Sequence, residues 1–312
     1  MHHIIIKTSG RSGSHRLHDF LDYHERTNCR SEIARNDTRM GALPQQDWPQ
    51  DLPGNFTELW VGAMRDSALR HSDRDRMMTE HKAYFRPFPT NLEVRLFRKP
   101  RLRRALYGIR GYEWKIPRRW LRPDQVDRIV PVIKGRAISW LEATHDALPD
   151  QYVVHGLRSP FGYLNSWWNR FVKRDGRGPE WTYDQVKALA APILDRNAAR
   201  PLADAFSLPE LIRGRLWLWR ELNGRMHASL CHSPRYLLLD YDDVSADPVA
   251  AARQIYAHCQ LDFDDRHAAR ITGGKKAVFN NPHSEKLDEA MMRDVAADAL
   301  DGFALADRYL KT

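Results

Sequence analysis

Cysteine is scarce in this chain. Its 312 residues include three, Cys29, Cys231 and Cys259, and none of them forms a CxxC pair. A disulfide framework and a zinc knuckle both need more cysteines at closer spacing. We therefore expect a protein of a reducing compartment, and specifically of the cytoplasm.

Long apolar runs are missing as well. The apolar triplet at residues 4–6 (III) is too short for the hydrophobic region of a signal peptide. No run approaches the roughly 18 apolar residues that a membrane span requires. The sequence also lacks HExxH and comparable metal-ligand spacings. We expect a soluble protein with no membrane span and no metal.

Basic residues are in excess. There are 49 Lys and Arg against 40 Asp and Glu, which gives a formal charge of +9, while 42% of the residues are hydrophobic. That hydrophobic content is adequate for a sizeable core. The charge indicates an anionic partner, which could be a nucleotide, a nucleic acid or an acidic glycan.

Three segments repeat the order strand, polar loop, helix. They begin with the apolar runs at residues 4–7 (IIIK), 152–157 (YVVHGL) and 236–241 (YLLLDY). Short apolar runs followed by helical periodicity are typical of a parallel α/β sheet. We predict one P-loop-like domain over residues 1–312, with three α/β/α layers around a central parallel sheet.

The region between the first two units is harder to interpret. Six prolines interrupt residues 41–107, and we predict a mostly helical or irregular insertion or lid there. Residues 107–116 could form a second strand. For residues 123–147 we predict a helix on the basis of the following apolar residues: Val126, Ile129, Val130, Ile133, Ile138 and Leu141.

The loop after the first strand predicts anion binding. Gly10 and Gly13 allow a tight turn whose backbone N–H groups, with the helix that follows, can point at a phosphate. A P-loop NTPase would need lysine directly after the second glycine, and Ser14 stands there instead. A kinase with a degenerate loop remains the alternative.

Three motifs together resemble a known family. Residues 11–15 (RSGSH) resemble the RSGS/T loop of bacterial and carbohydrate-type sulfotransferases, which use 3′-phosphoadenosine 5′-phosphosulfate (PAPS). Residues 158–160 (RSP), with Ser166 eight positions after the arginine, resemble the family's Arg-(seven residues)-Ser signature. Residues 239–248 (LDYDDVSADP) are similar to its RYEDLxxDP stretch, with Asp240 and Asp242 as departures.

This resemblance implies a site and a reaction of the sulfotransferase class (EC 2.8.2). PAPS is the implied co-substrate and adenosine 3′,5′-bisphosphate the product, with no metal. The implied nucleotide-binding residues are Arg11, Ser12, Gly13, Ser14, His15, Arg16, Arg158, Ser166, Lys275 and Lys276.

Catalysis needs positive charge at the leaving oxygen and a base for the acceptor. Arg11 takes the place of the family's catalytic cation, and Glu32 that of its proposed base. His15 and His24 are alternative bases, because imidazole titrates near neutral pH.

The acceptor is expected to offer a hydroxyl, or less readily an amine, on a carbohydrate or another small molecule. A basic protein that binds nucleic acid or glycan, through the arginines between Arg95 and Arg122, is a further alternative. Nucleic acid is the less favoured partner, and the sequence gives no oligomeric state.

Overall fold

The structure is a computed structural model that describes most of the chain. The described residues are 2–8, 14–31, 52–72, 82–86, 93, 96, 99–107, 113–134, 138–174, 178–273 and 286–311.

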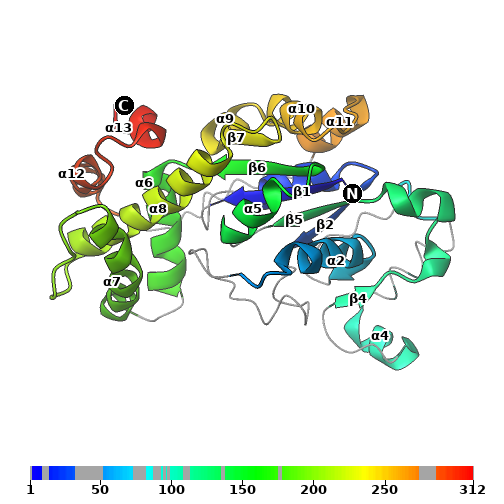
Figure 1. Ribbon diagram of the computed structural model, residues 1–312, viewed down its shortest axis with the longest axis horizontal. Coiled ribbons are helices and arrows are strands. Elements are labelled where there is room, and N and C mark those ends of the chain that lie inside the picture. Colours follow the sequence, from blue (N-terminus) through cyan, green and yellow to red (C-terminus); the bar gives the residue numbers. More distant parts are fainter. Residues whose placement is uncertain are drawn as a thin grey trace.

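A five-stranded parallel sheet forms the centre of the protein, as the sequence predicts (Figure 1). Its strand order is β2-β5-β1-β6-β7. The strands are β1 (His3–Thr8), β2 (Thr27–Ser31), β5 (Val130–Lys134), β6 (Gln151–Leu157) and β7 (Tyr236–Asp240). Every residue of β1 and of β6 is buried. Continuous apolar runs suit such strands because helices cover both faces of the sheet.

One face of the sheet is covered by helices that follow the first and third units. Ile4 and Ile6 of β1 point to this face and pack with Leu17 and Ile255. These helices are α1 (Ser14–Asp22), α9 (Tyr241–Ala246), α10 (Pro248–His258) and α11 (Asp265–Gly273).

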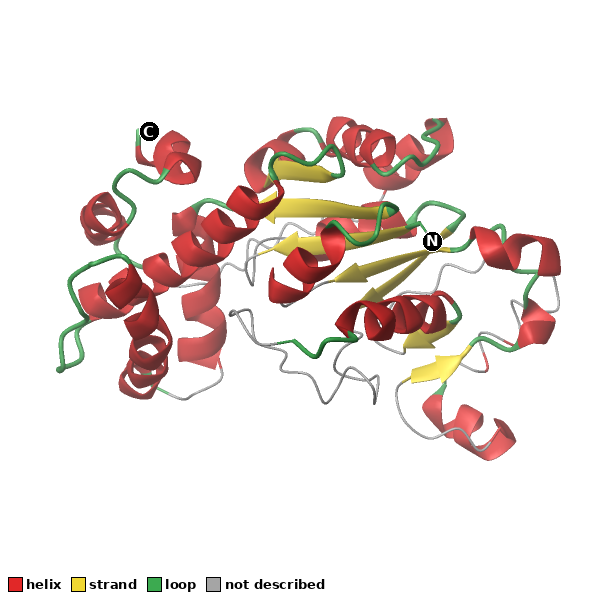
Figure 2. Cartoon of the chain, in the orientation of Figure 1, coloured by secondary structure: helices red, strands yellow, loops and turns green. Residues whose placement is uncertain are grey.

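The other face is covered by α2 (Phe56–Ala68), α5 (Ile138–His145) and the end of α8 (Leu208–Leu230). Ile5, between Ile4 and Ile6 on β1, points to this face, as the period-2 alternation of a strand requires. The three layers are visible in Figure 2.

A helical group extends the sheet on one side. It contains α6 (Pro160–Trp167), a π-helical segment η5 (Trp168–Arg174), α7 (Pro179–Arg196), α12 (Glu289–Ala299), η6 (Ala304–Ala306) and α13 (Asp307–Leu310). α8 belongs to both parts. Leu216 and Leu218 pack in the helical group, whereas Leu222 and Met226 pack under the sheet.

A smaller unit packs near the start of β2. It contains α4 (Pro100–Tyr107), the antiparallel pair β3 (Arg70–Ser72) and β4 (Glu113–Lys115), and the 3₁₀ turns η3 (Arg118–Trp120) and η4 (Pro123–Arg128). Its own core is largely aromatic and includes Tyr84, Phe85, Trp114 and Trp120.

Two predicted elements differ in the structure. Within residues 107–116, of which 108–112 lie outside the described ranges, the described strand is β4, which has three residues and lies outside the main sheet. The helix predicted for 123–147 is instead η4, β5 and α5. Residues 129–133 (IVPVI) are buried without a break, and Pro131 cannot donate the backbone hydrogen bond that a helix interior needs. The run therefore forms a strand.

Part of the predicted insertion belongs to a main layer. α2 lies within 41–107, yet Phe56, Trp60 and Met64 pack in the same cluster as Ile5 of the central strand. The single domain with a lid over the rest of this range stays a prediction.

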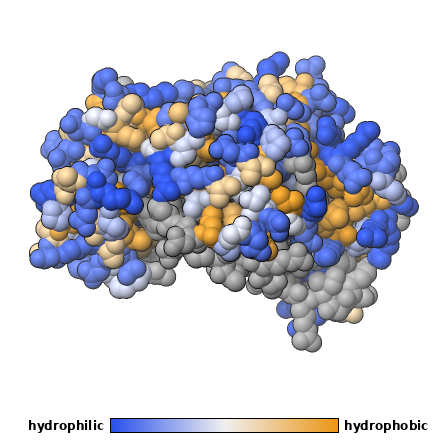
Figure 3. All heavy atoms as spheres, in the orientation of Figure 1, coloured by the Kyte–Doolittle hydropathy of each residue, from blue (hydrophilic) through white to orange (hydrophobic). Residues whose placement is uncertain are grey.

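The surface in Figure 3 is mainly hydrophilic, with scattered hydrophobic residues. Within the described ranges, the large exposed hydrophobic residues are Leu96, Phe171 and Trp181. None of the helices in this part of the chain has the length and apolarity to span a membrane.

Candidate active site

The carboxyl ends of the five parallel strands lie at one edge of the sheet, which we call the carboxyl edge. The chain leaves β1 toward β2 on one side and leaves β6 toward β7 on the other. Ligands of open α/β sheets bind at such a switch point, beyond the strand ends. Thr8 of β1 pairs with Gly156 of β6, two residues before Arg158. The first two motifs therefore start from adjacent strand ends.

The predicted phosphate loop follows β1 directly. Arg11, Ser12 and Gly13 lie outside the described residues. Ser14 is buried at the start of α1, and His15 is exposed in the first turn of the same helix. The described part of α1 thus starts where the sequence predicts that the helix follows the loop.

Arg16 connects the first motif to the third. Its Nη1 donates a hydrogen bond to Ser245 Oγ of α9 at 3.1 Å, across 229 positions of sequence. Its guanidinium also lies 5.9 Å from the centre of the Phe20 ring. The helices that follow β1 and β7 are therefore tied together beside the switch point.

Arg158 leaves the end of β6 and lies over a ring from the neighbouring strand end. Leu157 pairs with Asp240, so the residues after them, Arg158 and Tyr241, are neighbours. The Arg158 Cζ lies 5.2 Å from the centre of the Tyr241 ring. Burial lowers the pKa of Arg158, and the nearby Tyr241 and Asp242 oppose this shift. Arginine stays charged under all physiological conditions.

The first turn of α6 leaves room for the Arg158 side chain. Ser159 caps this helix by accepting a hydrogen bond from the Gly162 N–H at 3.0 Å. A Cβ on Gly162 would lie 2.9 Å from Arg158 Nε and 3.0 Å from Ser159 Oγ. Glycine therefore allows the arginine side chain to lie across the helix start. Gly162 was not predicted from the sequence, although a glycine four positions after Arg158 was a usable signal.

Ser166 lies on α6, half-buried, about 10 Å of helix beyond the cap. Its neighbour Asn165 accepts a hydrogen bond from the Leu287 N–H at 2.8 Å. Lys275 and Lys276 lie outside the described residues. The described chain resumes at residue 286, next to the hydrogen bond between Leu287 and Asn165.

Glu32 lies outside the described residues, but the strand that precedes it, β2, is described. Ser31, the last residue of β2, pairs with Lys134 at the end of β5. Glu32 therefore follows a strand that ends at the carboxyl edge. Lys134 is a further cation at this edge, and it was not predicted because β5 was expected to be part of a helix.

No family model and no curated protein sequence matches the chain. Several solved structures do. A sulfotransferase from Alicyclobacillus acidocaldarius is 15% identical with a TM-score of 0.45, covering 100% of this chain and 96% of its own. The sulfotransferase domain of the curacin biosynthetic pathway is 12% identical with a TM-score of 0.42, covering 85% and 76%. That of the Synechococcus PCC 7002 olefin synthase is 14% identical with a TM-score of 0.41, covering 99% and 94%.

The chain resembles sulfotransferases. The likeness is one of backbone fold.

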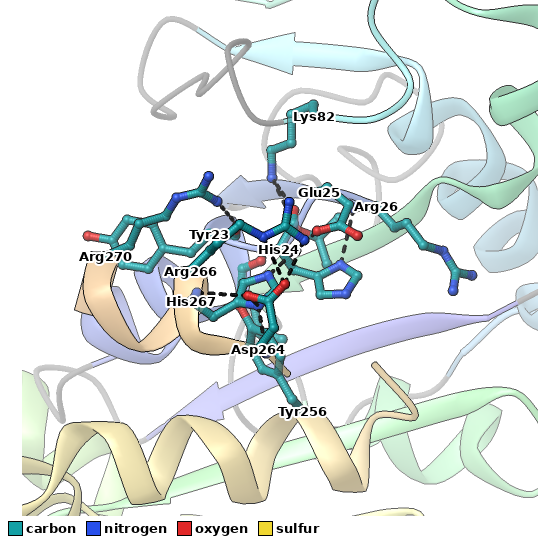
Figure 4. A network of polar contacts seen from close by, with 12 residues as sticks. Tyr23, His24, Glu25, Arg26, Lys82, Tyr256, Asp264, Arg266, His267 and Arg270 are labelled. Atoms are coloured by element: carbon teal, nitrogen blue, oxygen red, sulfur yellow. Dashed lines mark hydrogen bonds and ion pairs between the residues drawn. The ribbon is translucent and has the colours of Figure 1, made fainter. Parts of the chain in front are cut away.

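A second polar cluster lies at the opposite, amino edge of the sheet, where the chain enters β2 (Figure 4). His24, Glu25 and His267 bring three potential metal ligand atoms within 4.8 Å of one another. The two imidazoles are buried and stacked, with their centres 5.4 Å apart and their planes 8° from parallel. Neither Nε2 has a hydrogen-bond partner among the residues that the structure describes.

The other ring nitrogen of each histidine, Nδ1, faces a backbone N–H group. Nδ1 of His24 accepts a hydrogen bond from the Arg26 N–H, and Nδ1 of His267 accepts one from the Asp264 N–H, each at 3.1 Å. Asp264 in turn caps α11 by accepting from the His267 N–H, which explains its 2.8 Å approach to Nδ1. Burial lowers the pKa of His24 to about 3. Its ring is therefore neutral, with the proton on Nε2.

Nε2 of His267 lies 3.6 Å from Glu25 Oε2. We assign this cluster a structural role, in which the turn before β2 is tied to α11. The buried position of His24 at the amino edge also removes it as an alternative general base. His15, at the start of α1, remains an alternative.

Proposed function

We propose that this chain is a PAPS-dependent sulfotransferase that transfers a sulfuryl group to a hydroxyl of a carbohydrate or another small molecule. An amine is a less favoured acceptor. The free cysteines fit a cytoplasmic location, which we propose as well.

One observation carries the proposal. The strand pairs Thr8–Gly156 and Leu157–Asp240 bring the starts of all three sequence motifs to neighbouring positions at the switch point. A PAPS molecule has two anionic ends, and the motifs supply one cluster of donors after β1 and another after β6. The order of the motifs in the sequence did not require them to meet in space.

The reaction can be assigned to the chain's own residues. The acceptor oxygen attacks the sulfur atom and forms a new S–O bond, while the S–O bond to the 5′-phosphate breaks. The departing phosphate gains negative charge, which we propose that Arg11 stabilises together with the loop N–H groups. Glu32 takes the proton of the acceptor hydroxyl. Arg158 and Ser166 hold the 3′-phosphate.

The alternative, a P-loop-like kinase, has less support. The loop lacks the lysine that holds the β- and γ-phosphates of a nucleoside triphosphate. A kinase would bind ATP in a magnesium-dependent manner and would not prefer adenosine 3′,5′-bisphosphate. Titration with Mg²⁺-ATP and with adenosine 3′,5′-bisphosphate therefore separates the two functions.

Calorimetry with adenosine 3′,5′-bisphosphate tests the proposal. The wild type should bind with a micromolar or smaller Kd. Arg158→Ala should bind at least about 30-fold more weakly, a loss of about 2 kcal/mol or more, because a charged hydrogen bond to phosphate disappears. Arg196→Ala is a matched control, since Arg196 is an exposed residue of α7 that pairs with Glu221 at 2.6 Å.

Two results would contradict the proposal. One is a wild type that binds Mg²⁺-ATP more tightly than adenosine 3′,5′-bisphosphate. The other is an Arg158→Ala variant that binds the bisphosphate as the wild type does. A positive titration should be followed by measuring bisphosphate release from PAPS in the presence of mono- and oligosaccharides, which defines the acceptor class.

A further inference from the structure

The last part of the chain returns to the carboxyl edge. We call residues 286–311 the C-terminal arm. Its first residues meet α6 through the hydrogen bond from Leu287 to Asn165, and α12 packs in the helical group through Met292 and Ala296. Its end, α13, lies beside the end of β7. The arm thus touches the elements that carry Ser166 and Asp240.

Asp240 is the point where the arm meets the sheet. Its Oδ1 accepts a hydrogen bond from the Asp242 N–H at 2.7 Å and so caps α9. Its Oδ2 accepts a hydrogen bond from the Tyr309 hydroxyl and lies 3.3 Å from Arg308 Nη1. Its side chain is only 6% exposed, and burial raises the pKa of this carboxyl. The two arm residues thus supply donors that a buried carboxylate requires.

Arg308 also pairs with the next acidic residue. Its Nη1 and Nη2 lie 3.1 and 3.2 Å from the two carboxylate oxygens of Asp243. Asp240, Asp242 and Asp243 form an acidic group beside the place where the nucleotide phosphate is proposed to bind. Arg308, with one positive charge, pairs with two of these three carboxylates. Without it, the acidic group would repel the anionic ligand.

Asp240 is connected to Arg158 through one residue. Tyr241 follows Asp240 directly and begins α9, the helix that Asp240 caps. The Cζ atom of Arg158 lies 5.2 Å from the centre of the Tyr241 ring. The position of the ring depends on how the start of α9 is held, and Tyr309 and Arg308 hold the residue that caps it.

We propose that Tyr309 and Arg308 are positioning residues for Arg158, so that the C-terminal arm is required for tight binding of the nucleotide 3′-phosphate. This inference rests on the proposed function. Neither residue has to touch the nucleotide, since both act through Asp240 and Tyr241.

Binding of adenosine 3′,5′-bisphosphate to arm variants tests this inference. Tyr309→Phe removes one hydroxyl and keeps the ring, and it should weaken binding about tenfold. Arg308→Ala should have an effect at least as large, and Arg308→Lys should restore part of it through charge alone. Lys311→Ala is the matched control, because Lys311 lies at the end of the arm and pairs only with Asp307 among the described residues. It should bind as the wild type does.

A double-mutant cycle separates positioning from a general structural effect. Tyr309→Phe should weaken binding in the wild type and have no effect in the Arg158→Ala background, because the residue through which it acts is gone. Equal losses in both backgrounds would overturn the inference, and so would wild-type binding by both Tyr309→Phe and Arg308→Ala. Failure of the proposed function is a different outcome, since Arg158→Ala itself would then have no effect.

Discussion

The two edges of the central sheet both gather charged side chains, but they use them differently. At the amino edge, buried Lys82 donates hydrogen bonds to the backbone oxygens of Asp22 and His24 at 2.6 and 2.9 Å. At the carboxyl edge, the Arg158 guanidinium lies over the ring of Tyr241. The lysine holds a turn. The arginine lies at the strand end where we propose that the 3′-phosphate binds.

This difference shows that a buried charge does not by itself mark a binding site. The amino-edge groups join the segments from which they come. Lys82, for example, contacts the Asp22 carboxylate as well as backbone oxygens. The carboxyl-edge groups come from three strand ends and meet at the switch point. We therefore expect changes at the amino edge to alter stability, and changes at the carboxyl edge to alter binding or turnover.

The largest effect should come from Lys82→Met. Lys82 Nζ lies 3.2 Å from Asp22 Oδ1, and both side chains are almost fully buried. The substitution leaves the Asp22 carboxylate buried without its partner, which should cost about 3–5 kcal/mol of unfolding free energy. Urea denaturation measures this loss. Affinity for adenosine 3′,5′-bisphosphate should stay within about twofold of the wild type wherever the variant is folded.

Lys115→Met is the control for this change. Lys115 is exposed and lies 3.5 Å from Asp66, and its replacement should leave stability unchanged. A Lys82→Met variant that is as stable as the wild type, or that is stable but fails to bind the nucleotide, would break the distinction between the edges.

Glu32→Gln tests the carboxyl edge. The amide cannot accept the acceptor's proton, so turnover should fall by about a hundredfold while nucleotide affinity and unfolding free energy are kept. Steady-state kinetics and calorimetry measure the two properties. Glu58→Gln, at an exposed position of α2, should leave both unchanged. Wild-type turnover by Glu32→Gln would remove this residue from the mechanism and favour His15.

Low pH should lower the stability of the protein through protonation of His24 at the amino edge. Burial lowers its pKa to about 3, whereas the unfolded chain binds a proton near pH 6.5. A depressed folded-state pKa gives stability that is present above pH 6.5 and is lost as the pH falls toward the folded value. His24 alone should account for about 2 kcal/mol lost between pH 7 and pH 5.

Denaturation of His24→Gln at both pH values checks this expectation. The variant starts less stable but should lose about 2 kcal/mol less than the wild type over the same interval. An identical loss in both proteins would mean that His24 is not the group that titrates. Other buried histidines, such as His18 with a pKa lowered to about 4, add to the total loss.

The sequence alone predicted the strands that consist of a short apolar run followed by a polar loop. β1, β6 and β7 were found in this way, because their side chains are buried on both faces or lie between helices. β5 was not found. Its residues 129–133 follow a 3₁₀ turn and precede a true helix, and the apolar positions of the three pieces together imitate one helical period.

The candidate site was predictable in part for a related reason. Motif order placed Arg158 and Asp240 at the ends of strands, and parallel strands end at one edge. Local patterns could not show that Gly162 makes room for Arg158 or that Tyr309 reaches Asp240 across 69 positions of sequence. Such contacts depend on how whole helices pack. Charge alone likewise could not show that His24 lies at the other edge.

The long helix α8 has a consequence for cooperativity. Its 23 residues run from the helical group to the underside of the sheet, with apolar side chains buried in both. Loss of either cluster would expose half of this helix to water and remove the support of the other half. The two clusters should therefore melt in a single transition, although they resemble two small cores.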